Sequence, residues 1–165
     1  MLARATVREI LMGAQDNLTN VLAVVLGVTI GAGRADFVAL AGLSAGLAES
    51  VSMGGVLYNA TRTERLTTVS SASDGTRLTP IVSGLVTFAA SMVAGLVPLA
   101  PFAFLPVSSA ILVSMAASVI GLFVLGSITG RVAGGHWATE GLRLVAVAGV
   151  AALAAAVVGA ALKVA

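Results

Sequence analysis

The chain alternates between long apolar runs and shorter polar segments. Five mostly apolar runs can be marked along its 165 residues. About 20 apolar residues in a helix are enough to cross the roughly 30 Å hydrocarbon core of a bilayer. The pattern therefore predicts an all-α integral membrane protein, a single transmembrane domain over residues 1–165 with five transmembrane helices at about residues 8–33, 36–60, 80–99, 108–130 and 139–162.

The polar segments predict the orientation of these helices. Residues 61–79 form the longest polar connector, a surface loop whose first part could continue the second helix. Basic residues collect on the cytoplasmic side of membrane proteins. Most of the basic residues lie before the first predicted helix, between the second and third, and between the fourth and fifth. These segments share one side of the membrane, and only Arg34 and Lys163 fall on the other side. We therefore expect a cytoplasmic N-terminus and an external C-terminus in a multi-pass protein, most simply of the cell (inner) membrane.

Composition supports the membrane class and narrows the chemistry. The chain is 58% hydrophobic and only 10% charged, with a mean hydropathy of +1.07, whereas soluble domains carry about 25% charged residues. Its net charge of +2 comes from scattered residues, so nucleic acid is not an expected partner. The absence of cysteine excludes disulfides and thiolate metal sites. We expect no bound cofactor.

Two acidic residues interrupt the first two apolar runs. Asp16 lies about 12 Å beyond Arg8 if the segment is helical. A carboxylate at such a depth costs on the order of 3 kcal/mol and usually serves a function. Glu49 and Met53 lie four residues apart, so their side chains share one helix face. Met53 lies about 13 Å from Arg62. Asp16, Glu49 and Met53 are therefore predicted to line one ion path at a common depth.

These three residue types suit a particular class of ion. Carboxylates bind hard and intermediate divalent metals, and thioether sulfur disfavours Mg²⁺ and Ca²⁺. The mixture favours Fe²⁺ or Mn²⁺, and buried carboxylates can also exchange protons. Proton-coupled export of a divalent metal is the leading hypothesis. The alternative is a small structural or assembly membrane protein whose acids only fix helix pairing. An enzyme is disfavoured, because no Ser/His, paired-Asp or His-cluster arrangement is present.

The number of ligands predicts an oligomer. Divalent transition metals usually take four to six ligands, and Asp16, Glu49 and Met53 supply only three. A two-fold axis beside the first helix would double this set. Gly27 and Gly31 would let two copies of that helix approach. We therefore expect a homodimer through the first and second helices.

Four stretches resemble the vacuolar iron transporter family. Residues 13–18 (Gly-Ala-Gln-Asp-Asn-Leu), followed by Gly31-Ala32, are similar to its first-helix signature, which has a Gly-x-x-Asp-Gly-Leu core. Residues 41–58, with Ser52-Met53-Gly54, resemble its second-helix signature. Residues 95–102 resemble its third-helix ending, and residues 122–131 its fourth helix.

The resemblance implies a five-helix homodimer that moves Fe²⁺ or Mn²⁺ out of the cytosol in exchange for protons, with lipid as its surroundings. By the resemblance, Asp16 and Met53 match the aspartate and the methionine that line the family's ion path. Asn17 stands where glycine is usual, and Ala45 falls where some members carry a path glutamate, which Glu49 replaces one turn along. The connector at 61–79 is too short for the cytoplasmic metal-binding domain of eukaryotic members, so the chain resembles a short form.

Overall fold

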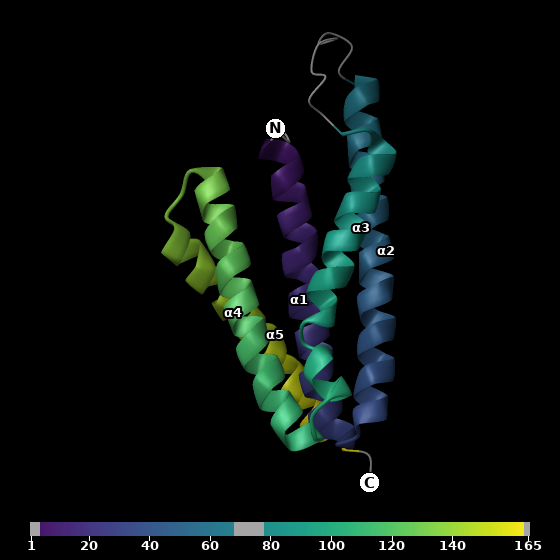
Figure 1. The fold of residues 1–165 in the computed structure, drawn as a ribbon, viewed down its shortest axis with the longest axis vertical. Helices are drawn as coiled ribbons and strands as arrows, with labels where there is room; N and C mark the ends of the chain where they lie inside the picture. Colours follow the sequence, from purple (N-terminus) through teal and green to yellow (C-terminus); the bar gives the residue numbers. More distant parts are fainter. Residues whose placement is uncertain (1–3, 68–77, 164–165) are drawn as a thin grey trace.

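A computed structural model describes residues 4–67 and 78–163, and all regular secondary structure within these ranges is helical. The described residues form five α-helices and one short 3₁₀ helix, and Figure 1 shows how the α-helices are arranged. Their bounds are α1 Arg4–Ala32, α2 Ala35–Thr67, α3 Pro80–Leu96, η1 Ala100–Ala103, α4 Val107–Ala133 and α5 Trp137–Ala161.

The lengths of these helices confirm the membrane class. Among the described residues, α1, α2, α4 and α5 are long and apolar enough to cross a bilayer. Helix α3 has only 17 residues, or about 26 Å, and ends three residues before its predicted end. Pro98 explains this difference, because proline lacks an amide hydrogen and its ring clashes with the preceding helical turn. The chain continues from there through a turn into η1.

Helix α2 also differs from its predicted bounds. It continues from residue 60 to Thr67, so the first part of the polar connector is helical, as the sequence suggested. Figure 1 shows this end of α2 extending past the other helices. The described N-terminal part of α1 likewise begins at Arg4 rather than near residue 8. A pattern based on hydropathy missed both extensions, because the residues in these helical turns are partly polar.

Helix α1 is the centre of the molecule. It contacts all four other α-helices, whereas α2 pairs with α3 and α4 pairs with α5. In Figure 1 the α2–α3 pair and the α4–α5 pair lie on opposite sides of α1 and diverge toward its N-terminal end. Buried leucines of α1 and α4 form part of the core, with Leu18 and Leu122 almost completely enclosed. Side chains on α1 are therefore placed against both pairs.

Small residues allow the helices to approach closely. A Cβ atom added at Gly126 would lie 2.7 Å from the carbonyl oxygen of Glu140, so α4 and α5 meet backbone to backbone. Gly27 faces Ala155 and Gly31 faces Gly159 in the same way. The expectation that Gly27 and Gly31 bring two protomers together is therefore wrong. Helix α5 of the same protomer already occupies that face of α1.

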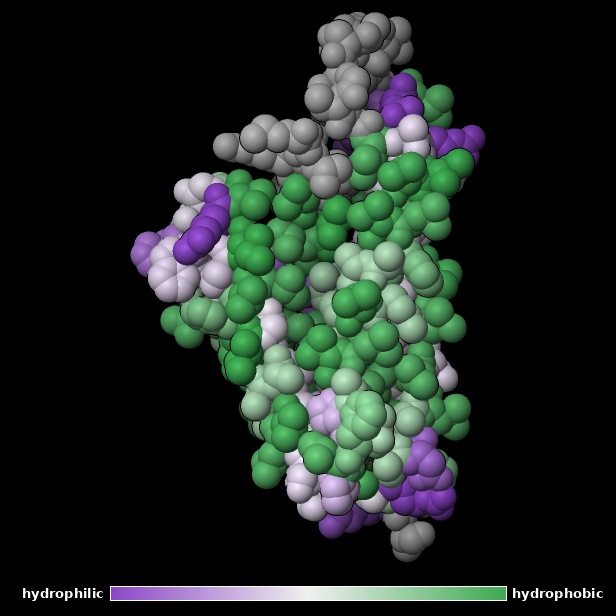
Figure 2. Space-filling model, viewed as in Figure 1, coloured by the Kyte–Doolittle hydropathy of each residue, from purple (hydrophilic) through white to green (hydrophobic). Residues whose placement is uncertain are grey.

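The surface is what a bilayer requires. Figure 2 shows a broad hydrophobic band over the middle of the molecule, with hydrophilic residues gathered toward its ends. Large apolar side chains such as Leu40, Leu112 and Leu153 are each 68% exposed. One end of the band carries the exposed Arg34–Asp36 ion pair. Near the other end lies Trp137, which packs edge-to-face on Phe123 and suits a membrane interface.

Candidate functional site

The structure brings Asp16, Glu49 and Met53 together between α1 and α2. The Glu49 side chain lies close enough to Asp16 and Asn20 to interact electrostatically with both. Asp16 and Met53 line the same open groove, whose volume is about 350 Å³. Asp16 thus lies close to Glu49 and also lines the groove that contains the Met53 thioether. Glu49 lies beside Asp16 rather than among the residues that line this groove, and the assignment of all three residues to one ion path stays a prediction.

The groove also contains residues that the sequence reasoning missed. Gln15 and Thr19 line it from α1, and Leu144 and Val147 line it from α5. Met12 adds a second thioether to the wall. It lies one helical turn before Asp16, and this i,i+4 spacing could have identified it. The contribution of α5 could not be read from the sequence, because it depends on how α5 crosses α1.

Exposure shows which side of the site is open. Asp16 and Asn20 are exposed on the protomer, and Met12 is 49% exposed, whereas Glu49 and Met53 are half-buried. Within the described residues, no three His, Cys, Asp or Glu side chains cluster closely enough to hold a metal ion. The groove of one protomer therefore combines the Asp16 carboxylate with the thioethers of Met12 and Met53.

The helix ends place this face toward one membrane surface. Counting along α1 from Ala32 gives about 24 Å to Asp16, and counting along α2 from Ala35 gives about 27 Å to Met53. The hydrocarbon core is about 30 Å thick. Measured from the Arg34 end, the site therefore lies in the far third of the membrane. The estimates from Arg8 and Arg62 placed it deeper, because both residues lie inside helices that continue past them.

Asn17 fixes the helices that carry the site. It is fully buried, and its Nδ2 donates to the Ser91 carbonyl oxygen at 2.8 Å and to the Ser50 hydroxyl at 2.9 Å. The carbonyl oxygen of Gly46 lies 3.1 Å from the same nitrogen. A Cβ atom at Gly95 would come within 2.8 Å of Nδ2, so only glycine leaves room there. Asn17 thus joins α1, α2 and α3 through hydrogen bonds of one side chain.

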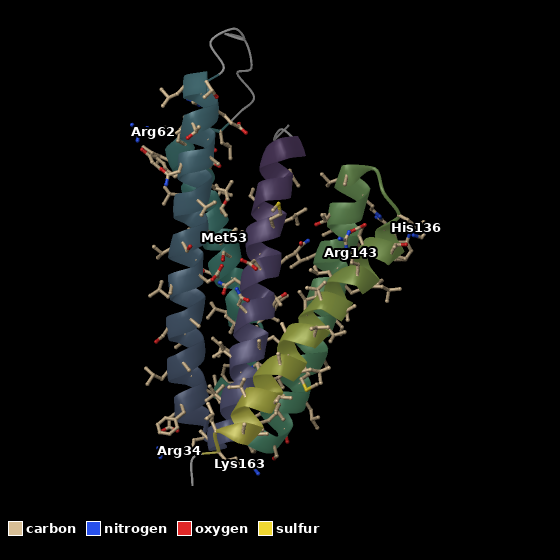
Figure 3. The ribbon with its side chains drawn as sticks, turned by 180° about the vertical axis from the view of Figure 1, so that it is seen from behind. Arg34, Met53, Arg62, His136, Arg143 and Lys163 are labelled. Carbon is tan, nitrogen blue, oxygen red and sulfur yellow. The ribbon has the colours of Figure 1, made fainter. Side chains whose placement is uncertain are left out.

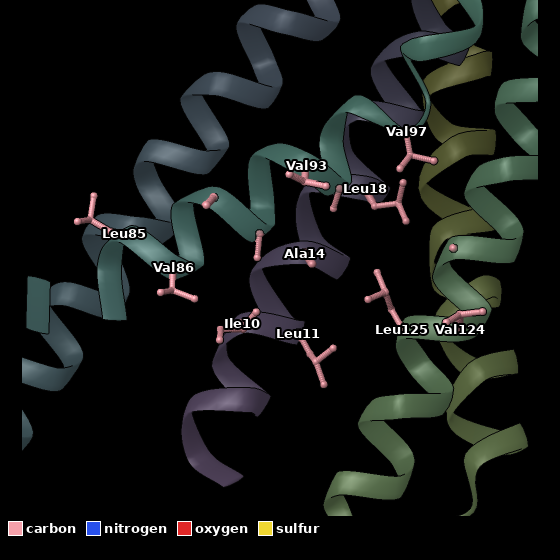
Figure 4. Close-up of a pocket in the computed structure, with 14 residues that line it drawn as sticks. Ile10, Leu11, Ala14, Leu18, Leu85, Val86, Val93, Val97, Val124 and Leu125 are labelled. Atoms are coloured by element: carbon pink, nitrogen blue, oxygen red, sulfur yellow. The ribbon is translucent and has the colours of Figure 1, made fainter. Parts of the chain in front are cut away.

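A second, larger groove has a different chemistry. It encloses about 800 Å³ between α1, α3 and α4, and every residue that lines it is apolar. Figure 4 shows Leu85, Val86 and Val93 of α3 beside this groove. It offers no ligand for an ion, and its lining resembles the lipid-facing surface around it. The groove that contains Asp16 is therefore the more polar of the two and the better candidate for a polar substrate.

The fold and this groove define a multi-pass helical membrane protein with a carboxylate pair and thioethers inside the membrane region. A family profile described as VIT family matches residues 7–74 and 66–160. The chain belongs to the VIT family, a family of metal-ion transporters. This membership confirms the resemblance found in the sequence. No curated protein matches the chain in a direct sequence search.

Proposed function

We propose that this protein transports Fe²⁺ or Mn²⁺ across the membrane, with Asp16, Glu49 and Met53 as ligands of the moving ion. The observation that carries the proposal is an open groove lined by Asp16 and the thioethers of Met12 and Met53, with Glu49 close to Asp16. Carboxylates attract a dication, and thioether sulfur favours intermediate metals over Mg²⁺ and Ca²⁺. The transporter role of the VIT family supports this reading.

The carboxylate pair also supports coupling to protons. A carboxylate can bind either a proton or a metal ion, so the same two acids can serve both ions in turn. A dication and a proton then compete for the same oxygen atoms. Binding of metal on one side of the membrane and of protons on the other then gives an exchange cycle. The Asp16–Glu49 contact supplies the pair that this cycle needs.

A homodimer would complete the site. The exposed face of α1 carries Met12, Asp16 and Asn20, and a carboxylate facing lipid is unfavourable. A two-fold axis beside this face would cover it with its own copy and double the ligands. Two protomers would then supply four carboxylates and at least two thioethers. This set satisfies the four to six ligands that a divalent metal usually takes.

The basic residues support export from the cytosol. The N-terminal segment and the connector between α2 and α3 belong on the cytoplasmic side by the positive-inside rule. The site then opens near the cytoplasmic surface of the cell membrane, where a metal for export would enter. Only residues 68–79 separate α2 from α3, which is too few for a folded metal-binding domain.

The transport proposal is tested with purified protein in liposomes. Uptake of Mn²⁺ and of Fe²⁺ is measured with and without a pH gradient. We expect Asp16→Asn to abolish flux, because the amide keeps the shape but loses the charge, while the amount of folded protein is unchanged. Asp36→Asn is the matched control, since Asp36 lies in the first turn of α2, far along that helix from Glu49 and Met53, and pairs with Arg34. Wild-type flux in Asp16→Asn would favour the structural or assembly alternative.

A further inference from the structure

The groove at Asp16 continues into a second hollow. A smaller cavity of about 120 Å³ lies between α1, α4 and α5, and it shares Gln15, Leu144 and Val147 with the groove. Its other walls are formed by Gly126, Thr129, Glu140 and Arg143. Because three residues line both spaces, the two hollows lie side by side. Together they make a depression that extends from Asp16 to the first turns of α5.

Polar side chains line this depression. Gln15 Nε2 donates a hydrogen bond to the Thr129 hydroxyl at 2.5 Å, and that hydroxyl donates to the Leu125 carbonyl oxygen at 2.9 Å. Gln15 therefore lies next to Asp16 in sequence and is held toward α4 in space. The cavity has room for water molecules, and its polar walls offer them partners. An apolar contact between these helices would need none of these groups.

Charged side chains form the outer end of the depression. Glu140 lies in the first turn of α5, and its Cβ and Cγ atoms pack against Gly130 of α4. Arg143 Nη1 lies 3.9 Å from Glu140 Oε2, and the two side chains are 75% and 39% exposed, respectively. Such an exposed pair is weak, so the Glu140 carboxylate keeps much of its field. In Figure 3 Arg143 lies at about the same height as Met53, so the depression reaches the site from the side.

We propose that this depression is a water-filled vestibule through which the cation reaches Asp16 within a single protomer. Glu140 concentrates cations at its mouth, Arg143 opposes them, and Gln15 and Thr129 replace part of their hydration on the way. The proposal rests on the transport function above and adds an entry route to it. Glu140 is thus a residue of entry, separate from the ligands at Asp16, Glu49 and Met53. Its effect is electrostatic and weakens as salt screens it.

Kinetics test the roles of the two charges. Glu140→Gln should raise the KM for Mn²⁺ uptake several-fold at low ionic strength and leave the maximal rate nearly unchanged. Arg143→Gln should lower KM under the same conditions. Asp36→Asn removes an acid from the opposite end of the molecule and should change neither value. Equal KM values for wild type and Glu140→Gln would overturn the role of Glu140.

Cysteine labelling tests the vestibule without relying on transport, since the native chain has no cysteine. Thr129→Cys should react with a membrane-impermeant cationic thiol reagent, faster than with an anionic one, and Mn²⁺ should slow the reaction. Ile128→Cys is the control, because Ile128 is the preceding residue on α4 and faces outward, 41% exposed. If the Thr129→Cys variant reacts no faster than the Ile128→Cys variant, the vestibule is wrong. If Thr129→Cys reacts as expected while wild type moves no metal, the vestibule stands and the transport proposal fails.

Discussion

Neighbouring residues on α1 have opposite roles at the site. Asp16 is exposed and meets Glu49, whereas Asn17 is fully buried and bonds to α2 and α3. A single residue step, about 100° of rotation around the helix, therefore separates the side chain at the groove from the one that holds the helices together. The identity of each residue could be read from the sequence, but the direction in which each points could not, because it depends on where the other helices pack.

Asn17→Ala should destabilise the protein. It removes the buried hydrogen bonds that Nδ2 of Asn17 donates to the Ser50 hydroxyl and to the carbonyl oxygens of Ser91 and Gly46. Loss of a buried polar partner costs about 1–3 kcal/mol. A lowered unfolding midpoint in detergent would show this effect. Asn20→Ala is the matched control and should leave the midpoint nearly unchanged, since Asn20 is exposed. Equal midpoints for the two variants would contradict the structural role of Asn17.

Met53→Leu should change the choice of metal more than stability. The substitution conserves volume, which usually costs less than about 1.5 kcal/mol, but it removes the sulfur that disfavours hard ions. We expect the ratio of Fe²⁺ and Mn²⁺ flux to Mg²⁺ flux to fall several-fold in liposomes. Met115→Leu on α4, outside the groove, should keep the wild-type ratio. An unchanged ranking in Met53→Leu would make Met53 a packing residue only.

At the scale of helices, hydropathy predicted where each helix lies in the sequence better than it predicted which helices pack together. The apolar runs placed α4 and α5 within a few residues of their observed bounds. The length of α2 was underestimated, because its last turns carry Arg62 and Glu64 and leave the apolar band. Gly27 and Gly31 showed that α1 has a close neighbour, but a glycine spacing does not say whether that neighbour is α5 or another protomer.

Gly159→Ala should weaken the packing of α5 on α1. A Cβ atom at this position would overlap the carbonyl oxygen of Gly27, and a backbone atom cannot move aside as a side chain can. Overpacking of this kind typically costs about 1–3 kcal/mol. Gly149→Ala on the same helix is the control, because nothing lies within 4 Å of the added methyl group. Thermal unfolding in detergent should separate the two variants, and similar midpoints would contradict this packing of α5.

At the scale of the whole molecule, the open side of the site constrains how two protomers can meet. The C-terminal half of α1 is closed, since α5 covers Gly27 and Gly31, and Val21 and Val25 are fully buried. The N-terminal half carries an exposed stripe at Met12, Asp16 and Asn20. A two-fold axis through the site therefore has to pass along this N-terminal half rather than along residues 21–32.

Cysteine cross-linking locates that axis. Residues near a two-fold axis face their own copies, so Met12→Cys and Asn20→Cys should each form disulfide-linked dimers when membranes are oxidised. Val21→Cys and Val25→Cys should stay monomeric, because both positions are buried inside one protomer. The chain has no native cysteine, so each band reports one position. If the exposed and buried positions cross-link equally, or if none does, the dimer axis does not pass beside Asp16. The ligands of the ion must then come from one protomer, with water completing its coordination.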